Sequence, residues 1–257
     1  MLSTLWNYRH FINGAVKREL QSQYSKSLLG TAWIIMNPLY MCILYSSIFS
    51  SLMTQTVSKQ SYTIYLAAGL LAWNFFIDIL NRSQIIYPAY ATIIKQHRFP
   101  LLCLSVIVLI LASLDFFVSF GLFTGYLIAT HAFPGWCFFA LFPVLLLQAA
   151  YALTLGTLLG ILNLFFRDIG KGLTLFLQLW FWMTPIVYTI HQVPETLQIL
   201  LFYNPLTALM RAYQTILVDQ TWPMWHPLLF PLFITLFLMG FFLWRYRQHA
   251  MDILDEF

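Results

Sequence analysis

Residues 17–38, KRELQSQYSKSLLGTAWIIMNP, decide the fold class, because here a charged amphipathic helix joins an apolar span through Leu28-Leu29-Gly30. In the helix, apolar side chains recur at spacings of three or four, while the basic side chains mostly occupy other faces. The apolar positions are Leu5, Tyr8, Ile12, Val16, Leu20 and Tyr24. Such a helix lies on a membrane surface, with lipid against one face and anionic groups against the other. The first membrane span follows it directly.

The composition also places the chain in a bilayer, since 60% of its residues are hydrophobic and only 9% are charged. Six stretches are apolar over the roughly 17 to 25 residues that a helix needs to cross a hydrocarbon layer of about 30 Å. These stretches are 29–52, 62–81, 101–129, 139–163, 172–190 and 226–244. Helices satisfy their own backbone hydrogen bonds in lipid, so we expect an all-α integral membrane protein with six transmembrane helices.

The basic residues predict the orientation of the spans. If the loops alternate between the two sides, eleven of the 13 Lys and Arg residues fall on one side, and only Lys59 and Arg211 fall on the other. Both termini are therefore expected in the cytoplasm. The net charge of +4 reflects this topology and does not require a nucleic-acid partner. We expect one membrane domain over residues 1–257, with an amphipathic helix (1–28), a six-helix membrane domain (29–244) and a cytoplasmic tail (245–257), and no cleavable signal peptide.

The motifs of common enzymes are missing from the sequence. There is no G-x-x-x-x-G-K-[ST] phosphate loop, and Gly170-Lys171 lacks both the earlier glycine and a following Ser or Thr. There is also no G-x-S-x-G or H-E-x-x-H sequence, and the three cysteines lack metal-ligand spacing. We therefore predict no catalytic, cofactor or metal site. Asp115 lies near the middle of a span, where a charged side chain in contact with lipid is unfavourable. We therefore expect it to have either a hydrogen-bonded structural role or a cavity-lining, gating role.

Two segments between the spans carry further signals. The 82–100 segment, RSQIIYPAYATIIKQHRFP, can form a short helix over residues 87–94, either as a docking element or as a basic membrane anchor. Before the last span, Asn204-Pro205 provides a helix cap and a first-turn proline, which favours two short re-entrant helices on the external side. These helices could gate an exit or simply pack at the interface. Gly121-x-x-x-Gly125 and Gly156-x-x-x-Gly160 can bring helices close together.

The order of these parts, from the amphipathic helix and Leu29-Gly30 turn to YNPLTALMRAYQ before the last span, resembles one family over nearly the whole chain. It is similar to the permease subunits of type-2 ABC exporters that move lipid-linked polysaccharides such as O-antigen and teichoic acid. Asn37-Pro38 leans towards that branch and away from the capsule exporters. The resemblance implies a subunit without its own ATPase activity that exports O-antigen for lipopolysaccharide biosynthesis across the bacterial inner membrane.

The resemblance also implies partners. These are a second copy of the chain, two ABC nucleotide-binding subunits that carry ATP and Mg²⁺, membrane lipid, and a glycan attached to undecaprenyl pyrophosphate. Two alternatives stay open. In the first, the same fold exports another lipid or a drug, and in the second the chain is a membrane-embedded enzyme that modifies glycans.

Site residues follow from the resemblance in four groups. Recognition of the lipid pyrophosphate is implied for Arg18, Lys26, Leu29 and Gly30. Coupling to the ATPase, through a cytoplasmic helix between spans two and three and a second loop, is implied for Tyr87, Ile94, Lys95, Arg98, Arg167 and Asp168. The glycan path is implied for Trp33, Tyr40, Tyr45, Trp180, Trp182 and Tyr188, because aromatic rings pack against sugar C–H faces. The external gate is implied for Asn204, Pro205 and Leu206.

Overall fold

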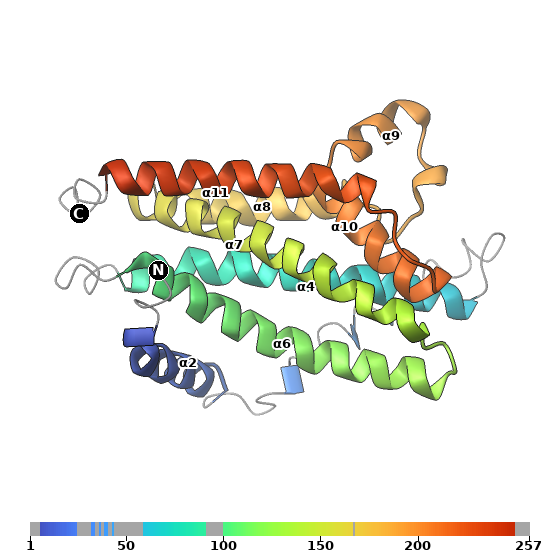
Figure 1. Cartoon of the computed structure of the whole chain (residues 1–257), viewed down its shortest axis with the longest axis horizontal. Helices are drawn as coiled ribbons and strands as arrows, with labels where there is room; N and C mark the ends of the chain where they lie inside the picture. The colour runs from blue at the N-terminus through green and yellow to red at the C-terminus, as the bar shows by residue number, and fades with distance from the viewer. Residues whose placement is uncertain are drawn as a thin grey trace.

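The computed structural model describes residues 6–24, 32–33, 36, 39–40, 43, 59–90, 100–166 and 168–249. This part of the chain is helical, and its long helices form an elongated bundle (Figure 1). The main helices are α2 (Arg9–Tyr24), α4 (Lys59–Ala89), α6 (Leu101–Ala129), α7 (Leu141–Phe165), α8 (Asp168–Trp182), α9 (Glu195–Phe202), α10 (Pro205–Gln214) and α11 (Leu229–His249). Short turns of other helix types are η1 (Gly135–Ala140), η2 (Ile190–Gln192), η3 (Thr215–Asp219) and η4 (His226–Leu228).

Four described segments are long and apolar enough to cross a membrane. They are Tyr62–Ala89, Leu101–Ala129, Gly135–Phe165 and His226–Trp244. An all-helical, multi-pass membrane protein is therefore confirmed. Most of the first predicted span, 29–52, lies outside the described residues, and the fifth has a different form from the one expected.

The fifth predicted span, 172–190, is not one continuous helix. Helix α8 ends at Trp182, and the chain then turns through residues 183–189 around Pro185, which lacks an N–H donor. Side chains from other helices donate to the carbonyl groups of this segment. The donors are Asn204 to Met183 (3.0 Å), Gln214 to Pro185 (3.0 Å), Tyr62 to Val187 (3.0 Å) and Tyr65 to Tyr188 (3.0 Å). Irregular backbone is tolerated in a membrane protein when neighbouring groups satisfy it in this way.

The second predicted span is longer than expected, because α4 continues past residue 81 to Ala89. Arg82, which was placed in a cytoplasmic loop, lies inside the helix and pairs with two carboxylates. Pro88 also lies inside α4, and its missing N–H leaves the carbonyl of Gln84 without its helical donor. The Nδ2 atom of Asn163 on α7 donates to that carbonyl at 3.1 Å. Contacts with other helices thus allow α4 to continue through a polar segment and a proline, where the sequence predicted a loop.

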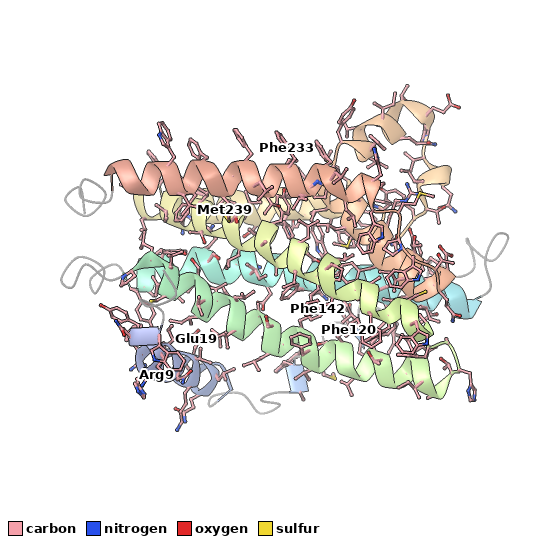
Figure 2. The ribbon with its side chains drawn as sticks, in the orientation of Figure 1. Arg9, Glu19, Phe120, Phe142, Phe233 and Met239 are labelled. Carbon is pink, nitrogen blue, oxygen red and sulfur yellow. The ribbon has the colours of Figure 1, made fainter. Side chains whose placement is uncertain are left out.

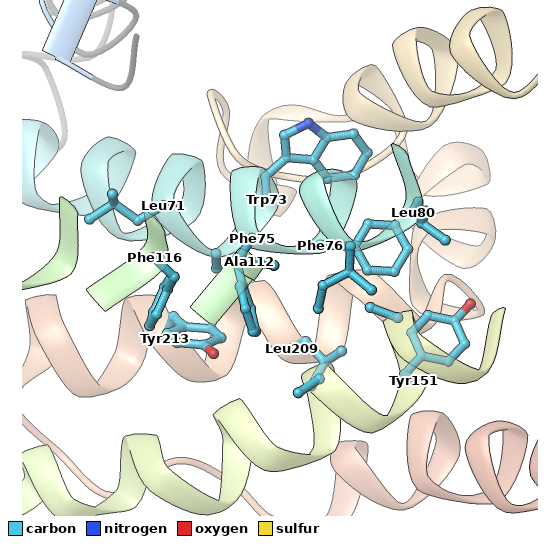
Figure 3. Packing of buried hydrophobic residues seen from close by; sticks show 14 of the residues in the cluster. Leu71, Trp73, Phe75, Phe76, Leu80, Ala112, Phe116, Tyr151, Leu209 and Tyr213 are labelled. Carbon is cyan, nitrogen blue, oxygen red and sulfur yellow. The ribbon is translucent and has the colours of Figure 1, made fainter. Parts of the chain in front are cut away.

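Helix α4 lies at the centre of the bundle and contacts α6, α7, α8 and α10. Its aromatic side chains pack against those of its neighbours (Figure 3). Phe76 stacks on Tyr151 of α7 with ring centroids 5.8 Å apart, and Phe75 meets Phe116 of α6 at 4.7 Å. Burial of these rings fixes the positions of three long helices relative to one another.

Only one of the two glycine pairs brings described helices together. A Cβ atom at Gly156 would lie 2.7 Å from Ser83 Oγ, and one at Gly160 would lie 2.5 Å from Cδ2 of Tyr87. At Gly121 and Gly125, no atom of the described residues lies within 4 Å of such a Cβ. The prediction of close helix contact is therefore confirmed for the α7 pair against α4, while the α6 pair faces open space in this part of the structure.

The outer surface of the bundle is apolar. Large hydrophobic side chains are exposed along α6, α8 and α11, and Figure 2 shows Phe233 pointing away from the bundle, where it is 69% exposed. An apolar exterior of this extent is typical of a surface in contact with lipid. It agrees with the membrane assignment made from composition.

Helix α2 is amphipathic, but its apolar side faces protein. Ile12, Ala15 and Val16 are buried, and α2 contacts α6. Lys17 and Arg18 are exposed on the other side. The expectation that lipid covers the apolar face is thus wrong for Ile12 and Val16, because α6 offers them a complementary apolar surface. Figure 1 shows α2 and the C-terminal end of α11 at one end of the bundle, with α9 at the other.

Candidate functional site

A cleft of about 860 Å³ lies between α4 and α8. It is lined on the α4 side by Leu70, Trp73, Asn74, Ile77, Asn81, Gln84 and Ile85, and on the other by Asn163, Gly170, Lys171, Thr174, Leu177, Gln178, Phe181 and Trp182. The two helices run in opposite directions along the cleft, so its walls extend through much of the depth of the bundle. Its size fits a ligand site.

Polar side chains form a stripe on each wall of the cleft. On α8, Lys171, Thr174 and Gln178 follow one another at spacings of three and four, which places them on one helix face. On α4, Asn74 and Asn81 are seven residues apart and share a face in the same way. Amide and hydroxyl groups thus line opposite sides of a cleft inside an otherwise apolar bundle.

The inner end of the cleft is held by Asn163, which lies in the last turn of α7. Its Oδ1 atom accepts the backbone N–H of Gly170 at 3.0 Å, and its Nδ2 atom donates to the Gln84 carbonyl. One side chain therefore joins α4, α7 and the first turn of α8. In the same turn of α8, the backbone N–H of Ile169 donates to the carbonyl of Phe166 at 3.0 Å.

The outer end is held by Asn204, the buried N-cap of α10. Its Oδ1 atom accepts the N–H of Leu206 at 3.1 Å and the indole N–H of Trp180 at 3.0 Å. Its Nδ2 atom donates to Met183 O and to Thr184 Oγ1, both at 3.0 Å. Helix α10 begins at Pro205, as Asn204-Pro205 predicts. This residue therefore couples the end of α8 to the start of α10.

A charge cluster links α4 and α6. The guanidinium group of Arg82 donates from Nε to both oxygens of Asp78, at 2.9 and 2.8 Å, and from an Nη atom to Asp115 at 2.5 Å. Asp115 is thus hydrogen-bonded inside the protein, which is the first of the two roles expected for it. The cluster contains two carboxylates and one cation, and Asp115 does not lie on the α4–α8 cleft.

The residues expected to contact the lipid pyrophosphate and the ATPase are only partly described. Arg18 is exposed on α2, and Asp168 is exposed at the start of α8. Tyr87 is fully buried, and its hydroxyl group contacts Ser105 Oγ at 2.8 Å and donates to Thr157 Oγ1 at 3.2 Å. It belongs to α4 and packs inside the bundle, so its side chain is not exposed on the described surface. Outside the described residues lie Lys26, Leu29, Gly30, Ile94, Lys95, Arg98 and Arg167.

The aromatic residues expected along a glycan path do not share one environment. Trp180 packs inside the bundle between Phe76 and Phe176, with ring centroids 5.5 and 5.1 Å away. Trp182 is exposed and lines the α4–α8 cleft. The Tyr188 hydroxyl donates to the Trp182 carbonyl at 2.7 Å. Trp33 and Tyr40 are exposed, and Tyr45 lies outside the described residues.

The sequence analysis did not single out the amide side chains of the cleft, because they lie within long apolar spans. A signal was present: polar residues recur on one face of 168–182, and the seven-residue spacing of Asn74 and Asn81 repeats that face on α4. The partner of Asn163 could not have been found, because the Gln84 carbonyl becomes available only through Pro88.

Comparison with known proteins agrees with this architecture. Residues 12–218 match the ABC-2 type transporter family, a region that begins in α2 and ends in η3. The chain is 28% identical over 232 residues to the O-antigen export system permease protein RfbA of Myxococcus xanthus, covering 89% of this chain and 88% of that one. It is 27% identical to an RfbA of Klebsiella pneumoniae, covering 79% and 78%. The polysialic acid transport protein KpsM of Escherichia coli is 23% identical, covering 91% and 92%.

Proposed function

The chain belongs to the ABC-2 type transporter family, and from this premise we propose that it is the permease subunit of an ATP-driven exporter of lipid-linked polysaccharide. The observation that carries the proposal is the near full-length similarity to permeases named for O-antigen export. The polar cleft supports it, since a hydrated sugar chain needs hydrogen-bonding groups inside an apolar bundle. The similarity favours O-antigen as the cargo over a drug or another lipid.

The cargo is a glycan attached to undecaprenyl pyrophosphate, and its charged head binds at the cytoplasmic membrane surface. Arg18 supplies positive charge from the exposed side of α2. Lys26, Leu29 and Gly30, which follow it in the sequence and lie outside the described residues, belong to the same proposed site. A pyrophosphate needs donors and positive charge, which an arginine side chain provides in a planar fork. This assignment extends the pattern of residues 17–38 to a chemical role.

The exporter is a homodimer with two ABC nucleotide-binding subunits, which bind ATP and Mg²⁺. Both termini lie on the cytoplasmic side of a bacterial inner membrane, an arrangement supported by the placement of α2 and the end of α11 at one end of the bundle (Figure 1). The ATPase docks near Asp168 and Arg167 and on the segment that contains Ile94, Lys95 and Arg98.

Asn204, Pro205 and Leu206 belong to the external gate. Asn204 supports this role because it bonds to both α8 and the start of α10, so a shift of α8 would be transmitted to the short helices. Leu206 is fully buried and packs in the same region of the bundle. ATP binding in the partner subunits would move the helices, and the gate would open at the opposite end.

The test is ATP hydrolysis by the reconstituted complex with its ATPase subunits. We expect undecaprenyl-pyrophosphate-linked glycan to stimulate hydrolysis, and the same lipid without glycan to stimulate it less. Stimulation by drug-like amphiphiles but by neither lipid would refute the proposed cargo and favour the alternative exporter. Glycan modification without ATP would favour the enzyme.

Arg18→Ala tests the proposed contact with the charged head, and Lys17→Ala is its matched control, because both residues are exposed on α2. Loss of one basic anchor to anionic lipid costs about 1 kcal/mol. We expect Arg18→Ala to abolish most of the stimulation by cargo while basal hydrolysis and assembly persist, and Lys17→Ala to keep most of it. Equal effects of the two variants would make Arg18 an ordinary lipid anchor.

A further inference from the structure

We propose that the α4–α8 cleft is a saccharide-binding groove in which Gln84, Asn81 and Gln178 hydrogen-bond the hydroxyl groups of the cargo glycan. The inference rests on the proposed function and deepens it, because it moves the glycan contacts from an aromatic path to an amide-lined one. It also adds α4 as a wall of that path.

Gln84 carries the argument. Its side chain lines the cleft and is 8% exposed, yet neither Oε1 nor Nε2 has a hydrogen-bond partner among the described residues. A buried amide without partners is costly, and such groups are rare in native proteins. The backbone of the same residue is anchored by Asn163, which fixes where the amide lies. A ligand that enters the cleft would supply the missing partners.

The other amides of the bundle show that this is not a general property of its packing. Asn204 uses both its side-chain oxygen and its side-chain nitrogen, and Gln214 donates to the Pro185 carbonyl. Gln148 donates to the Ala72 carbonyl at 2.6 Å, although its Oε1 atom lacks a partner. Among the described residues, Gln84 is the one amide side chain with both atoms buried and unpartnered. Its side chain lines the cleft.

The chemistry of the walls selects the class of ligand. A primary amide offers two donors and an acceptor with two lone pairs, which suits a hydroxyl group that both donates and accepts. Gln178 on α8 and Asn81 on α4 add further primary amides, and Thr174 on α8 adds a hydroxyl group. Trp73 and Trp182 provide apolar surface for the C–H faces of sugar rings. Lys171 is the one cation that lines the described cleft, which suits a largely neutral, hydroxylated chain.

The experiment compares Gln84→Met with Ile77→Met in the reconstituted complex. Both variants place methionine in the same cleft, but only the first removes hydrogen-bonding atoms. We expect Gln84→Met to raise the melting temperature without cargo by roughly 2 to 8 °C, because a buried unpaired amide is removed. We also expect the glycan concentration for half-maximal stimulation of ATP hydrolysis to rise about three- to tenfold. Ile77→Met should leave that concentration within about twofold.

A higher melting temperature with unchanged stimulation would mean that the Gln84 amide destabilises the bundle without contacting the glycan, and would overturn the inference. A lower melting temperature with weaker stimulation would make it a structural residue, which would overturn the inference as well. If the lipid-linked glycan stimulates the wild-type and Gln84→Met complexes equally, the proposed glycan binding in the α4–α8 cleft is refuted, while the proposed cargo is not. If wild type shows no stimulation, the cargo proposal fails and the inference fails with it.

A second measurement does not depend on the Gln84 variant. In a background without Cys42, Cys103 and Cys137, Asn81→Cys should react with a small hydrophilic thiol reagent, and the lipid-linked glycan should slow that reaction at least threefold. Phe233→Cys, on the outward face of α11, should stay unreactive. Labelling of Asn81→Cys at the same rate with and without glycan would overturn the groove.

Discussion

Gly160→Ala should destabilise the bundle, because α7 and α4 meet there at backbone distance. The added Cβ would lie 2.5 Å from Cδ2 of Tyr87 and 2.6 Å from the backbone carbonyl oxygen of Ser83. A carbonyl in the middle of α4 cannot move without shifting the helix. Tyr87 cannot swing away cheaply either, since its hydroxyl group bonds to Ser105 and Thr157 on two other helices.

The magnitude follows from three contributions. Overpacking of a well-filled core costs about 1 to 3 kcal/mol. Displacement of Tyr87 would weaken two buried hydrogen bonds, at about 1 kcal/mol each. Replacing glycine by alanine inside a helix stabilises the folded protein by about 1 kcal/mol, because alanine has the higher helix propensity. We therefore expect a net loss of about 2 to 4 kcal/mol in the free energy of unfolding for Gly160→Ala.

Gly125→Ala on α6 is the matched control. No described atom lies within 4 Å of its added Cβ, so only the helix-propensity gain of about 1 kcal/mol applies. The free energies of unfolding of both variants would be measured in mixed micelles by titration with a denaturing detergent. A difference of about 3 kcal/mol or more between them is expected. Equal stability of the two variants would refute the close contact between α7 and α4.

Further substitutions at four residues test the polar contacts that hold the helices. Arg82→Gln leaves two carboxylates without their cation and should lower the free energy of unfolding by about 2 to 4 kcal/mol in the same titration. Asp115→Asn keeps one ion pair and should lower it by under about 1 kcal/mol. A larger loss for Asp115→Asn than for Arg82→Gln would contradict this electrostatic explanation. Asn163→Leu removes the donor to the carbonyl that the α4 proline leaves free and the acceptor of an α8 N–H, so the melting temperature of the purified protein should fall by an amount equivalent to about 2 to 3 kcal/mol. Asn204→Asp keeps the oxygen that accepts the Leu206 N–H and the indole N–H but loses two donated hydrogen bonds, so it should lower the free energy of unfolding by about 1 kcal/mol. Its melting temperature should lie between those of wild type and Asn204→Ala. A melting temperature equal to that of Asn204→Ala would refute the capping role of Asn204.

Several local features could be predicted because they depend on residues close in sequence. The amphipathic pattern of residues 5–24 gave the helical periodicity of α2, and Asn204-Pro205 gave the start of α10. Long apolar runs gave the spans that became α6, α7 and α11. Each of these signals acts over a few turns of helix, where side-chain spacing and capping chemistry are sufficient.

The interruptions were harder to predict. Arg82 and Pro88 read as a loop because an unpaired charge and a missing N–H are both unfavourable within a membrane helix. In the structure, Asp115 supplies a counter-charge from α6 and Asn163 supplies a donor from α7, so the helix continues. The opposite happens after Trp182, where an apolar run stops being helical because other helices satisfy its carbonyls.

The sequence by itself determined that this chain is a helical membrane protein, because lipid leaves the backbone of a long apolar segment little choice but to bond within itself. Only the tertiary structure decided where the helices end, which glycines are contacts, and that the Gln84 amide in the cleft has no partner among the described residues. Those outcomes depend on donors, acceptors and volumes brought from residues up to about 125 positions away, as between Tyr62 and Val187. A polar group within an apolar span can destabilise the protein or form a binding site, depending on which groups pack beside it. The packing of the helices against one another decides which groups these are.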